Sequence, residues 1–367
     1  MLEMKKTIAY INPDCYFETD LTVLKYLATQ YQVIWYPVYY TDRPIYYTPD
    51  QLQEYAGRYG IEIHLCPRLY RQRDPRNYGI YKRIVGEINE RKAELVFSCI
   101  TEELYWVLAS RKLKAKRVVG LHDVVKHSLS HRFKRMVQGW IHRYAVKTSD
   151  YVCVFSEYQQ EKYRAIYKKN CYNLGMSCKD FGPSYLQPGK LAAGCDLLFF
   201  GGIMRYKGLD LLIGELEKLH GQGIRNLRLT IAGDGEDRDA CKALIRTPEL
   251  YRLQMRFIDN SEIADLMCSH HFLVLPYRDV TQSGPLMIAA NYGLPVMAPA
   301  MGSFTELYDD YSAILYDSLE DALMKAAALS EQDYARMRES AARLHERCSQ
   351  QIVAHRYIDY FNTLLEA

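Results

Sequence analysis

The sequence predicts an α/β protein of two domains, each built on a doubly wound parallel sheet with helices on both faces. Short, continuous apolar runs, which are typical of strands buried on both faces, alternate with amphipathic stretches along both halves of the chain. A segment rich in glycine and proline, residues 182–194, separates the two series. The 367 residues also exceed what a single core usually holds.

The individual elements follow from these runs. The candidate strands of the first half are 7–12, 32–40, 61–66, 94–99, 117–121 and 151–155, and its clearest helical stretches are 20–30, 102–112 and 157–169. The candidate strands of the second half are 196–200, 227–232, 255–258, 271–275, 295–298 and 313–316. Three helices are predicted after them, at 318–329, 331–347 and 349–366. We therefore expect a first domain over 1–187, a second over 188–348, and a C-terminal helix in 349–367 that packs back towards the first domain.

Charge is distributed unevenly between the two halves. Residues 1–187 carry 29 Lys and Arg against 19 Asp and Glu, a net charge of +10, whereas the remaining 18 basic and 25 acidic residues give −7. A basic half favours an anionic substrate or surface. The ten cysteines show no zinc-binding spacing, and neither a signal peptide nor a membrane-spanning run is apparent. We expect a cytoplasmic protein with free thiols.

An anion site is predicted where the strand at 196–200 ends. The run LLFFGGIMRYKG places Gly201 and Gly202 at the strand end, with Arg205 and Lys207 beside them, and a helix begins directly afterwards. Glycines let the backbone approach a ligand closely, and phosphate groups bind at such helix starts. The alternative for this segment alone is an ordinary turn with solvated basic residues.

A second anion site is predicted after the strand at 271–275. Ser283 is a suitable N-cap, and Gly284 and Pro285 begin a helix whose free N–H groups can bind an anion. If the two strands are neighbours, both sites lie in one crevice at the C-terminal ends of the strands. Together they would hold a diphosphate.

With these motifs the chain resembles the family-4 retaining glycosyltransferases, which use nucleotide-sugar donors. The similar segments are FFGGIMRYKGLDLLI, LTIAGDGED and LPYRDVTQSGPLMIAANYGLPVMAPAMGSFTEL in the second half, and VVGLHD and VCVFSEYQQEKY in the first. The resemblance implies the GT-B fold, in which two Rossmann-like domains face a cleft. It also implies retention at the anomeric carbon, an acidic-half domain that binds the donor, and no metal or other cofactor.

The chain departs from the family pattern at three places. The two glutamates of the family's E-x7-E motif fall on Val280 and Ile288, and the family arginine after the strand glycine falls on Gly202. The glycine-rich loop that often follows the first strand is replaced by residues 13–17. These departures leave the ribose contact and the identity of the sugar open.

Candidate site residues follow from the motifs and the resemblance. Lys207, Arg205 and His122 are the candidate catalytic residues: the first two for the leaving diphosphate, and the third to face the donor sugar. The candidate donor-binding residues are Gly201, Gly202, Gly233, Asp279, Gln282, Ser283, Gly284 and Glu306. Each has a structural alternative: His122 bonded to Asp123, Asp279 paired with Arg278, and Glu306 serving only a helix start. The acidic run 234–237 is read as a turn rather than a metal site.

The acceptor is predicted less directly. Residues 126–147 form a basic stretch with large apolar residues at helical spacing, which indicates either a packed helix with a solvated basic face or attachment to an anionic membrane. By resemblance, the acceptor is a glycan or a lipid-linked sugar in surface polysaccharide synthesis. The alternatives are a catalytically silent GT-B protein that serves a partner enzyme, and a sugar-nucleotide epimerase or phosphorylase. No module for binding nucleic acid is apparent.

Overall fold

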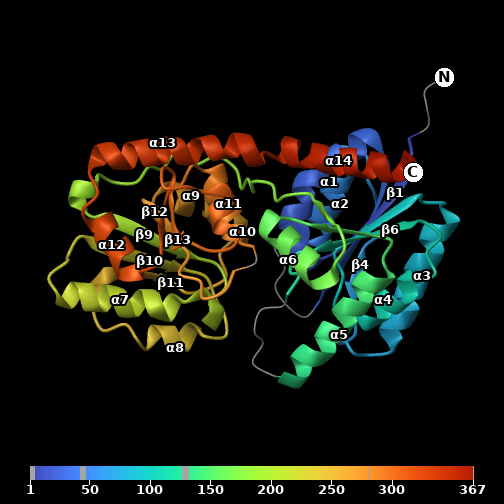
Figure 1. Ribbon diagram of the computed structural model, residues 1–367, viewed down its shortest axis with the longest axis horizontal. Helices are drawn as coiled ribbons and strands as arrows, with labels where there is room; N and C mark the ends of the chain where they lie inside the picture. The colour runs from blue at the N-terminus through green and yellow to red at the C-terminus, as the bar shows by residue number, and fades with distance from the viewer. Residues whose placement is uncertain (1–4, 42–46, 126–131, 281, 367) are drawn as a thin grey trace. The chain divides into compact units, whose positions relative to one another are not determined.

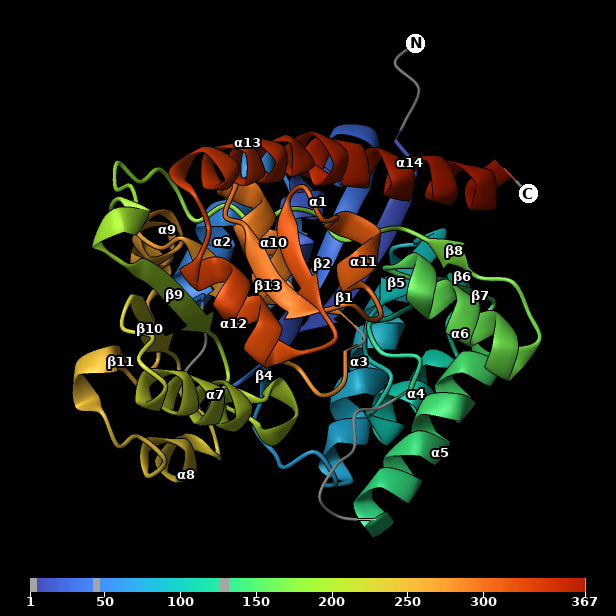
Figure 2. The same cartoon turned by 60° about the vertical axis from the view of Figure 1, so that its left-hand side comes forward.

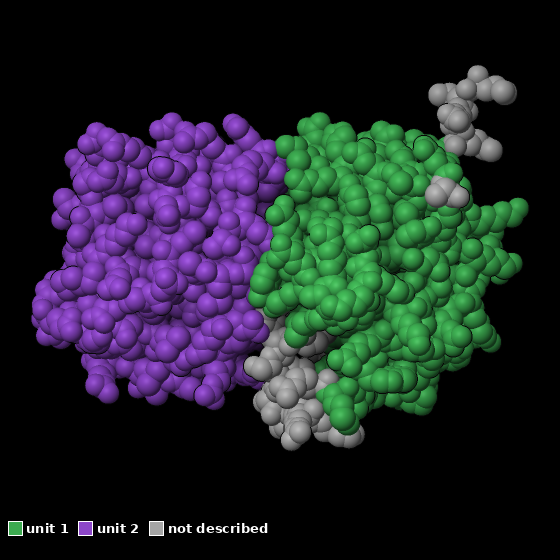
Figure 3. Space-filling view, viewed as in Figure 1, with its two compact units in different colours: residues 1–177, 350–367 green, residues 178–349 purple. Residues whose placement is uncertain are grey.

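The computed structural model describes residues 5–41, 47–125, 132–280 and 282–366 (Figure 1). The chain forms two compact units, coloured separately in Figure 3. Unit 1 comprises residues 1–177 and 350–367, and unit 2 comprises residues 178–349. Each unit is an α/β domain, as the sequence predicts.

In unit 1 the strands are β1 (Thr7–Pro13), β2 (Gln32–Tyr40), β3 (Glu62–Ile63), β4 (Cys66–Arg68), β5 (Leu95–Ser98), β6 (Lys116–Leu121), β7 (Tyr151–Val154) and β8 (Tyr172–Asn173). Its helices are α1 (Phe17–Gln30), α2 (Pro49–Tyr59), α3 (Arg76–Glu90), α4 (Leu104–Ser110), α5 (Arg132–Thr148), α6 (Glu157–Tyr167) and α14 (Gln350–Glu366). The strands are all parallel in the order β3-β2-β1-β5-β6-β7-β8, and β4 also pairs with β2.

In unit 2 the strands are β9 (Cys195–Phe200), β10 (Leu227–Ala232), β11 (Tyr251–Gln254), β12 (Phe272–Val274), β13 (Val296–Pro299) and β14 (Ala313–Tyr316). Its helices are α7 (Leu209–Gly221), α8 (Arg238–Lys242), α9 (Asn260–Cys268), α10 (Gly284–Asn291), α11 (Phe304–Leu307), α12 (Leu319–Ala327) and α13 (Glu331–Cys348). All pairings are parallel, in the order β11-β10-β9-β12-β13-β14.

Both sheets are buried on two faces. Successive side chains along a strand point to opposite faces, and each face is covered by packed residues. On β1, Ile8 and Tyr10 belong to the core that includes α1, α2 and α14, whereas Ala9 and Ile11 pack in the core formed with α3, α4 and α5. This two-sided burial explains why the strands read as continuous apolar runs rather than as alternating patterns.

The C-terminal helix α14 belongs to unit 1. Val353, Tyr357 and Phe361 are buried in the core of that unit, and α14 packs along α1, as Figures 1 and 2 both show. The hydroxyl of Tyr31 donates a hydrogen bond to Oδ1 of Asn362 at 2.7 Å. The expected helical tail is therefore the last layer of the first domain.

The chain passes into unit 2 earlier than the predicted boundary at residue 187. The backbone N–H of Cys178 donates to the carbonyl of Cys348 at 2.7 Å, and that of Lys179 donates to the carbonyl of Met287 at 3.3 Å. These bonds attach the start of the glycine- and proline-rich segment to α13 and α10. The segment is therefore part of the second unit rather than a separate linker.

One predicted strand is wrong. The run 255–258 is not a strand, and β11 lies directly before it, with Tyr251 opposite Leu229 of β10. After Gln254 the chain turns, since the N–H of Arg256 bonds back to the Gln254 carbonyl at 2.8 Å. The runs 251–254 and 255–258 are adjacent and similar in character, but only the first pairs with β10.

Candidate functional site

The predicted donor residues of unit 2 gather where its strand order reverses. Strands β9 and β12 are neighbours in the sheet, although β10 and β11 intervene in sequence. The loops that leave their C-terminal ends, residues 201–208 and 275–283, therefore begin side by side. This is the position at which doubly wound sheets bind ligands. The expectation that the strands at 196–200 and 271–275 are neighbours is confirmed.

Glycines are required here because backbone packs directly against backbone. Gly201, Gly208 and Gly233 have φ values of 111°, 69° and 147°. A Cβ at residue 233 would overlap the carbonyl oxygen of Gly201, and one at residue 208 would overlap that of Pro276. The glycines thus serve first to bring three strand-end loops together, and the loops in turn position the side chains of the site.

Lys207 ends the 3-10 turn Arg205–Lys207 and directs its ammonium towards the first glycine. Its Nζ lies 3.3 Å from the position that a Cβ on Gly201 would occupy, and 5.7 Å from the ring centroid of Tyr277. Burial lowers the pKa of Lys207, and the nearby charge of Lys179 lowers it further, while Tyr206 acts in the opposite direction. No ion pair of Lys207 is found among the described residues. An entering anion would therefore meet a desolvated cation.

The start of α10 adjoins this ammonium. Ser283 is buried and caps the helix, its hydroxyl accepting a hydrogen bond from the N–H of Leu286 at 3.4 Å. Pro285 lies in the first turn, and its Cγ is 3.6 Å from the Cβ position of Gly201. Helix N–H groups, the strand-end glycine and Lys207 thus converge, as the sequence predicts for a diphosphate site.

Arg205 and Asp279 are both exposed. The Arg278 guanidinium binds both carboxylate oxygens of Asp210, at 2.7 and 2.6 Å. A further bond, from Arg278 to the carbonyl oxygen of Arg205 at 2.6 Å, fixes the turn that carries Lys207. Arg278 therefore helps to position Lys207 by holding the turn in which this lysine lies.

The remaining donor-side predictions lie around the same loops. Gly202 lies near the ammonium, since its Cβ position is 3.8 Å from Nζ of Lys207, and Gln282 is half-buried directly before the cap of α10. Glu306 is half-buried in the short helix α11. Asp234 accepts a hydrogen bond from the N–H of Gly235 at 2.9 Å and pairs with Arg238 at 3.2 Å. The acidic run thus forms a turn, as interpreted from the sequence.

His122 lies in unit 1, directly after β6. It is buried, and its ring stacks between those of Tyr16 and Phe155, with centroid distances of 3.7 and 4.2 Å. The rings hold the imidazole at the C-terminal edge of the sheet, next to the loop that follows β1. Its predicted role towards the donor sugar stays a prediction.

Unit 1 contains a buried ion pair that the sequence analysis missed. Arg68, the last residue of β4, pairs with Glu103, which precedes α4, and Tyr81 donates a hydrogen bond to the same carboxylate. Both charged side chains are buried. The pair lines a cavity of about 240 Å³ at the C-terminal ends of β1, β4 and β5. The only sign of this ion pair in the sequence was that Arg68 and Glu103 each lie at the end of a strand or the start of a helix.

A larger cavity of about 710 Å³ lies beside it, between the start of α4, the middle of α5 and the loop at 71–73. The two cavities share Gln72 and Glu102. The apolar lining of the larger cavity comes from Leu104, Val137 and Ile141, and its charged lining from Arg71, Arg73 and Glu102. An apolar lining with charged groups beside it suits an amphiphilic ligand.

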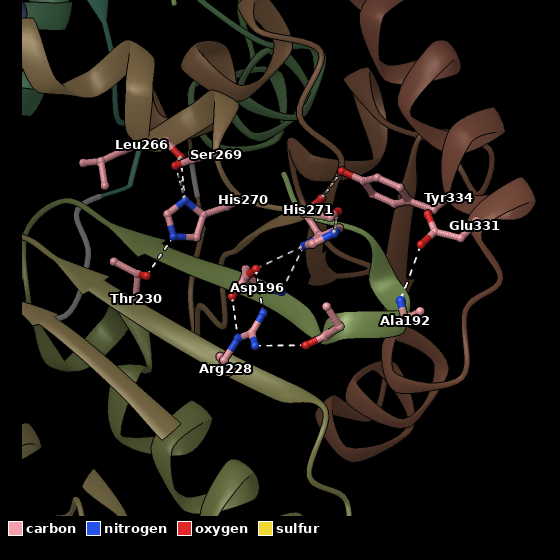
Figure 4. Close-up of polar contacts among 12 residues, drawn as sticks. Ala192, Asp196, Arg228, Thr230, Leu266, Ser269, His270, His271, Glu331 and Tyr334 are labelled. Atoms are coloured by element: carbon pink, nitrogen blue, oxygen red, sulfur yellow. Dashed lines mark hydrogen bonds and ion pairs between the residues drawn. The ribbon is translucent and has the colours of Figure 1, made fainter. Parts of the chain in front are cut away.

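The histidines of unit 2 form a different kind of cluster (Figure 4). His270 is bonded to the carbonyl of Leu266 and the hydroxyl of Thr230, both at 2.7 Å, and His271 to the carbonyl of Gly189 at 2.9 Å and the N–H of Asp196 at 3.0 Å. Burial lowers the pKa of both imidazoles. With both ring nitrogens of each histidine engaged, the cluster is structural.

Within the described ranges, none of the helices has the length and apolar character needed to span a bilayer. The same residues contain no group of three His, Cys, Asp or Glu side chains arranged to hold a metal ion.

A known protein family resembles part of the second unit. Residues 194–331 match the family model described as glycosyl transferases group 1. No curated protein sequence matches the chain.

Solved structures share the fold of the whole chain. A glycosyltransferase from Rickettsia africae is 15% identical with a TM-score of 0.71, covering 98% of this chain and 99% of its own. Sucrose-phosphate synthase from Thermosynechococcus elongatus is 14% identical with a TM-score of 0.73, covering 99% and 100%. Anabaena HepE, in complex with UDP and glucose, is 14% identical with a TM-score of 0.69, covering 98% and 100%.

Proposed function

We propose that this chain is a group 1 glycosyltransferase, which transfers a sugar from a nucleoside diphosphate donor to a lipid-linked acceptor with retention at the anomeric carbon. The match of residues 194–331 and the shared GT-B fold support this proposal. The donor binds unit 2, and the acceptor binds unit 1. Surface polysaccharide synthesis at the inner face of a membrane is the setting that we infer for this reaction.

The observation that carries the proposal is the half-buried side chain of Lys207, whose ammonium lies beside Gly201 at the switch point of unit 2. Breaking the bond between the anomeric carbon and the donor oxygen leaves its electron pair on the departing diphosphate. The acceptor hydroxyl oxygen forms the new bond, and its proton passes to the departing phosphate. Lys207 and the N–H groups of α10 are placed to stabilise this developing charge, which is the main catalytic contribution available to such a site.

The two cavities of unit 1 support a lipid-linked acceptor. The larger cavity can hold an apolar chain, and Arg71 and Arg73 in its lining can bind the phosphate groups of the lipid. The smaller cavity, lined by Arg68, Glu103 and Tyr40, can bind sugar hydroxyls. Both open from the strand-end loops of unit 1.

Donor turnover tests the proposal against its alternatives. Thermal unfolding should be measured with a panel of nucleoside diphosphates and their sugars, because a ligand at 100 times its Kd stabilises the folded protein by about 2.7 kcal/mol. Slow hydrolysis of the stabilising donor without an acceptor should then be followed. Binding without hydrolysis or transfer indicates the silent protein, and interconversion of sugar epimers without an acceptor indicates an epimerase. No stabilisation by any donor contradicts all three.

The ribose of the donor is predicted to be held without a carboxylate from α10. Ile288, at the position of the second family glutamate, is buried among apolar neighbours. Ile288→Glu should lower the free energy of unfolding by about 1–3 kcal/mol, because the new carboxyl is buried without a designed partner. It should not tighten donor binding, measured by titration calorimetry. Ile288→Met, which conserves volume, is the control, and a large gain in affinity for the glutamate variant would show a lost ribose contact instead.

The helix α5 is predicted to dock on an anionic membrane. Residues 126–131 of the predicted basic stretch lie outside the described residues, as do the side chains of 132–135. On the described part, Met136, Trp140, Arg143 and Lys147 are exposed, and their spacing of four, three and four residues places them on one stripe. Such a stripe combines apolar residues that insert with basic residues that attract anionic lipid.

Each basic residue near an anionic surface contributes about 1 kcal/mol. Arg143→Gln with Lys147→Gln should therefore weaken binding to phosphatidylglycerol vesicles by about thirtyfold at low salt. Trp140→Ser should weaken it further, while donor hydrolysis stays unchanged. Arg164→Gln, an exposed basic residue on α6, is the matched control. If the wild-type protein ignores these vesicles at low ionic strength, α5 is a packed helix with a solvated face.

A further inference from the structure

A second lysine, Lys179, lies beside the proposed donor site, although it belongs to none of the motifs found in the sequence. Lys179 follows the crossing into unit 2 and is 7% exposed. Its backbone is attached to α10 through the bond to the Met287 carbonyl. Its Nζ lies 3.2 Å from the position that a Cβ on Gly284 would occupy. The ammonium therefore stands at the first residue of α10.

Lys179 and Lys207 approach that helix start from two segments. Lys207 lies towards Gly201, whose Cβ position is close to Pro285, and Lys179 lies towards Gly284. The two charges interact, since Lys179 contributes to lowering the pKa of Lys207. Two like charges taken out of water repel each other, whereas a dianion between them is attracted to both. The arrangement is therefore favourable for a ligand with several negative charges.

We propose that Lys179 is a second diphosphate-binding lysine, which holds the donor's diphosphate together with Lys207 and the N–H groups of α10. This inference rests on the proposed function, since it assigns a residue to the donor site. Glycine at residue 284 leaves room for the ammonium of Lys179.

Binding of inorganic pyrophosphate to the full chain tests the assignment without the unknown base and sugar. Titration calorimetry should compare the wild type with Lys179→Met, Lys179→Arg and Lys207→Met. A charged hydrogen bond is lost in the methionine variants, so Lys179→Met should weaken binding about tenfold or more. Lys179→Arg should recover most of the affinity. Lys190→Met removes an exposed lysine of the same segment and should leave binding unchanged.

Thermal unfolding without ligand separates binding from folding. The unfolding temperature of each variant is measured first without ligand, and the further rise on adding pyrophosphate should be smaller for Lys179→Met than for the wild type. Lys179→Met should also remove the charge that lowers the pKa of Lys207. The pKa of Lys207, measured by NMR of labelled lysine, should therefore rise. Lys179→Gln, which keeps a polar side chain, replaces the methionine variant if that variant does not fold.

The outcomes distinguish this inference from the proposed function. Loss of binding in Lys207→Met but not in Lys179→Met overturns the role of Lys179 and leaves the donor site intact. Equal affinity of all variants overturns both lysine assignments. If the wild type binds neither pyrophosphate nor UDP, the proposed donor site itself is wrong.

Discussion

Replacing Lys207 with alanine is expected to lower the rate of sugar transfer by roughly 10²–10³-fold, or about 3–4 kcal/mol of transition-state stabilisation. The side chain is half-buried, and its ammonium lies beside the strand-end glycine Gly201, close to the start of α10. Its charge matters most when the diphosphate departs, so kcat should fall more than donor affinity. Single-turnover rates at saturating donor measure this effect.

The fold should survive the change, because the turn around Lys207 is held by backbone bonds and by Arg278 rather than by the lysine. Lys325→Ala, which removes an exposed lysine on α12, serves as the control. Near-normal turnover in well-folded Lys207→Ala would remove this residue from the mechanism.

Replacing Glu103 with alanine is expected to destabilise unit 1 by about 3–5 kcal/mol, since it leaves the buried guanidinium of Arg68 without its carboxylate. Urea unfolding followed by tryptophan fluorescence measures this unit selectively, because the three tryptophans, Trp35, Trp106 and Trp140, all lie in it. Trp106 is a near reporter, with its ring 5.7 Å from that of Tyr81.

The exposed pair of Arg58 and Glu54 on α2 gives the matched comparison, and Glu54→Ala should cost no more than about 1 kcal/mol. Replacing Arg68 and Glu103 together by leucine should recover much of the loss, because no unpaired charge remains. A cost below about 1 kcal/mol for Glu103→Ala would mean that water reaches the guanidinium, and the smaller cavity would then be a wet groove.

The sequence predicts those parts of the fold that depend on local pattern. Continuous apolar runs identified eleven of the described strands in outline, and most of these strands are buried on both faces of their sheets. The edge strand β3 is only half-buried, and the sequence did not separate it from β4. The strand β11 was misplaced because its identity depends on pairing with β10, which is a contact between distant segments. The two-residue strand β8 is too short to leave a pattern.

The site divides in the same way. Lys207, Ser283 and the glycines could be predicted because each lies within a few residues of a strand end, where local sequence carries the signal. Lys179 could not, because its approach to Gly284 spans more than a hundred residues of chain and no motif surrounds it. The partner of Arg278 was missed for the same reason, because Asp210 lies on α7, distant in the sequence from the loop that carries Arg278.

The return of α14 to unit 1 has a consequence for the order in which the protein forms during translation. The whole of unit 2 is synthesised before the residues that complete the other core, among them Val353, Tyr357 and Phe361. Until α14 emerges, apolar side chains of α1 and β1 remain uncovered beside a neighbour that can already fold. Unit 2 should therefore fold first, and a chaperone is most needed while unit 1 still lacks α14.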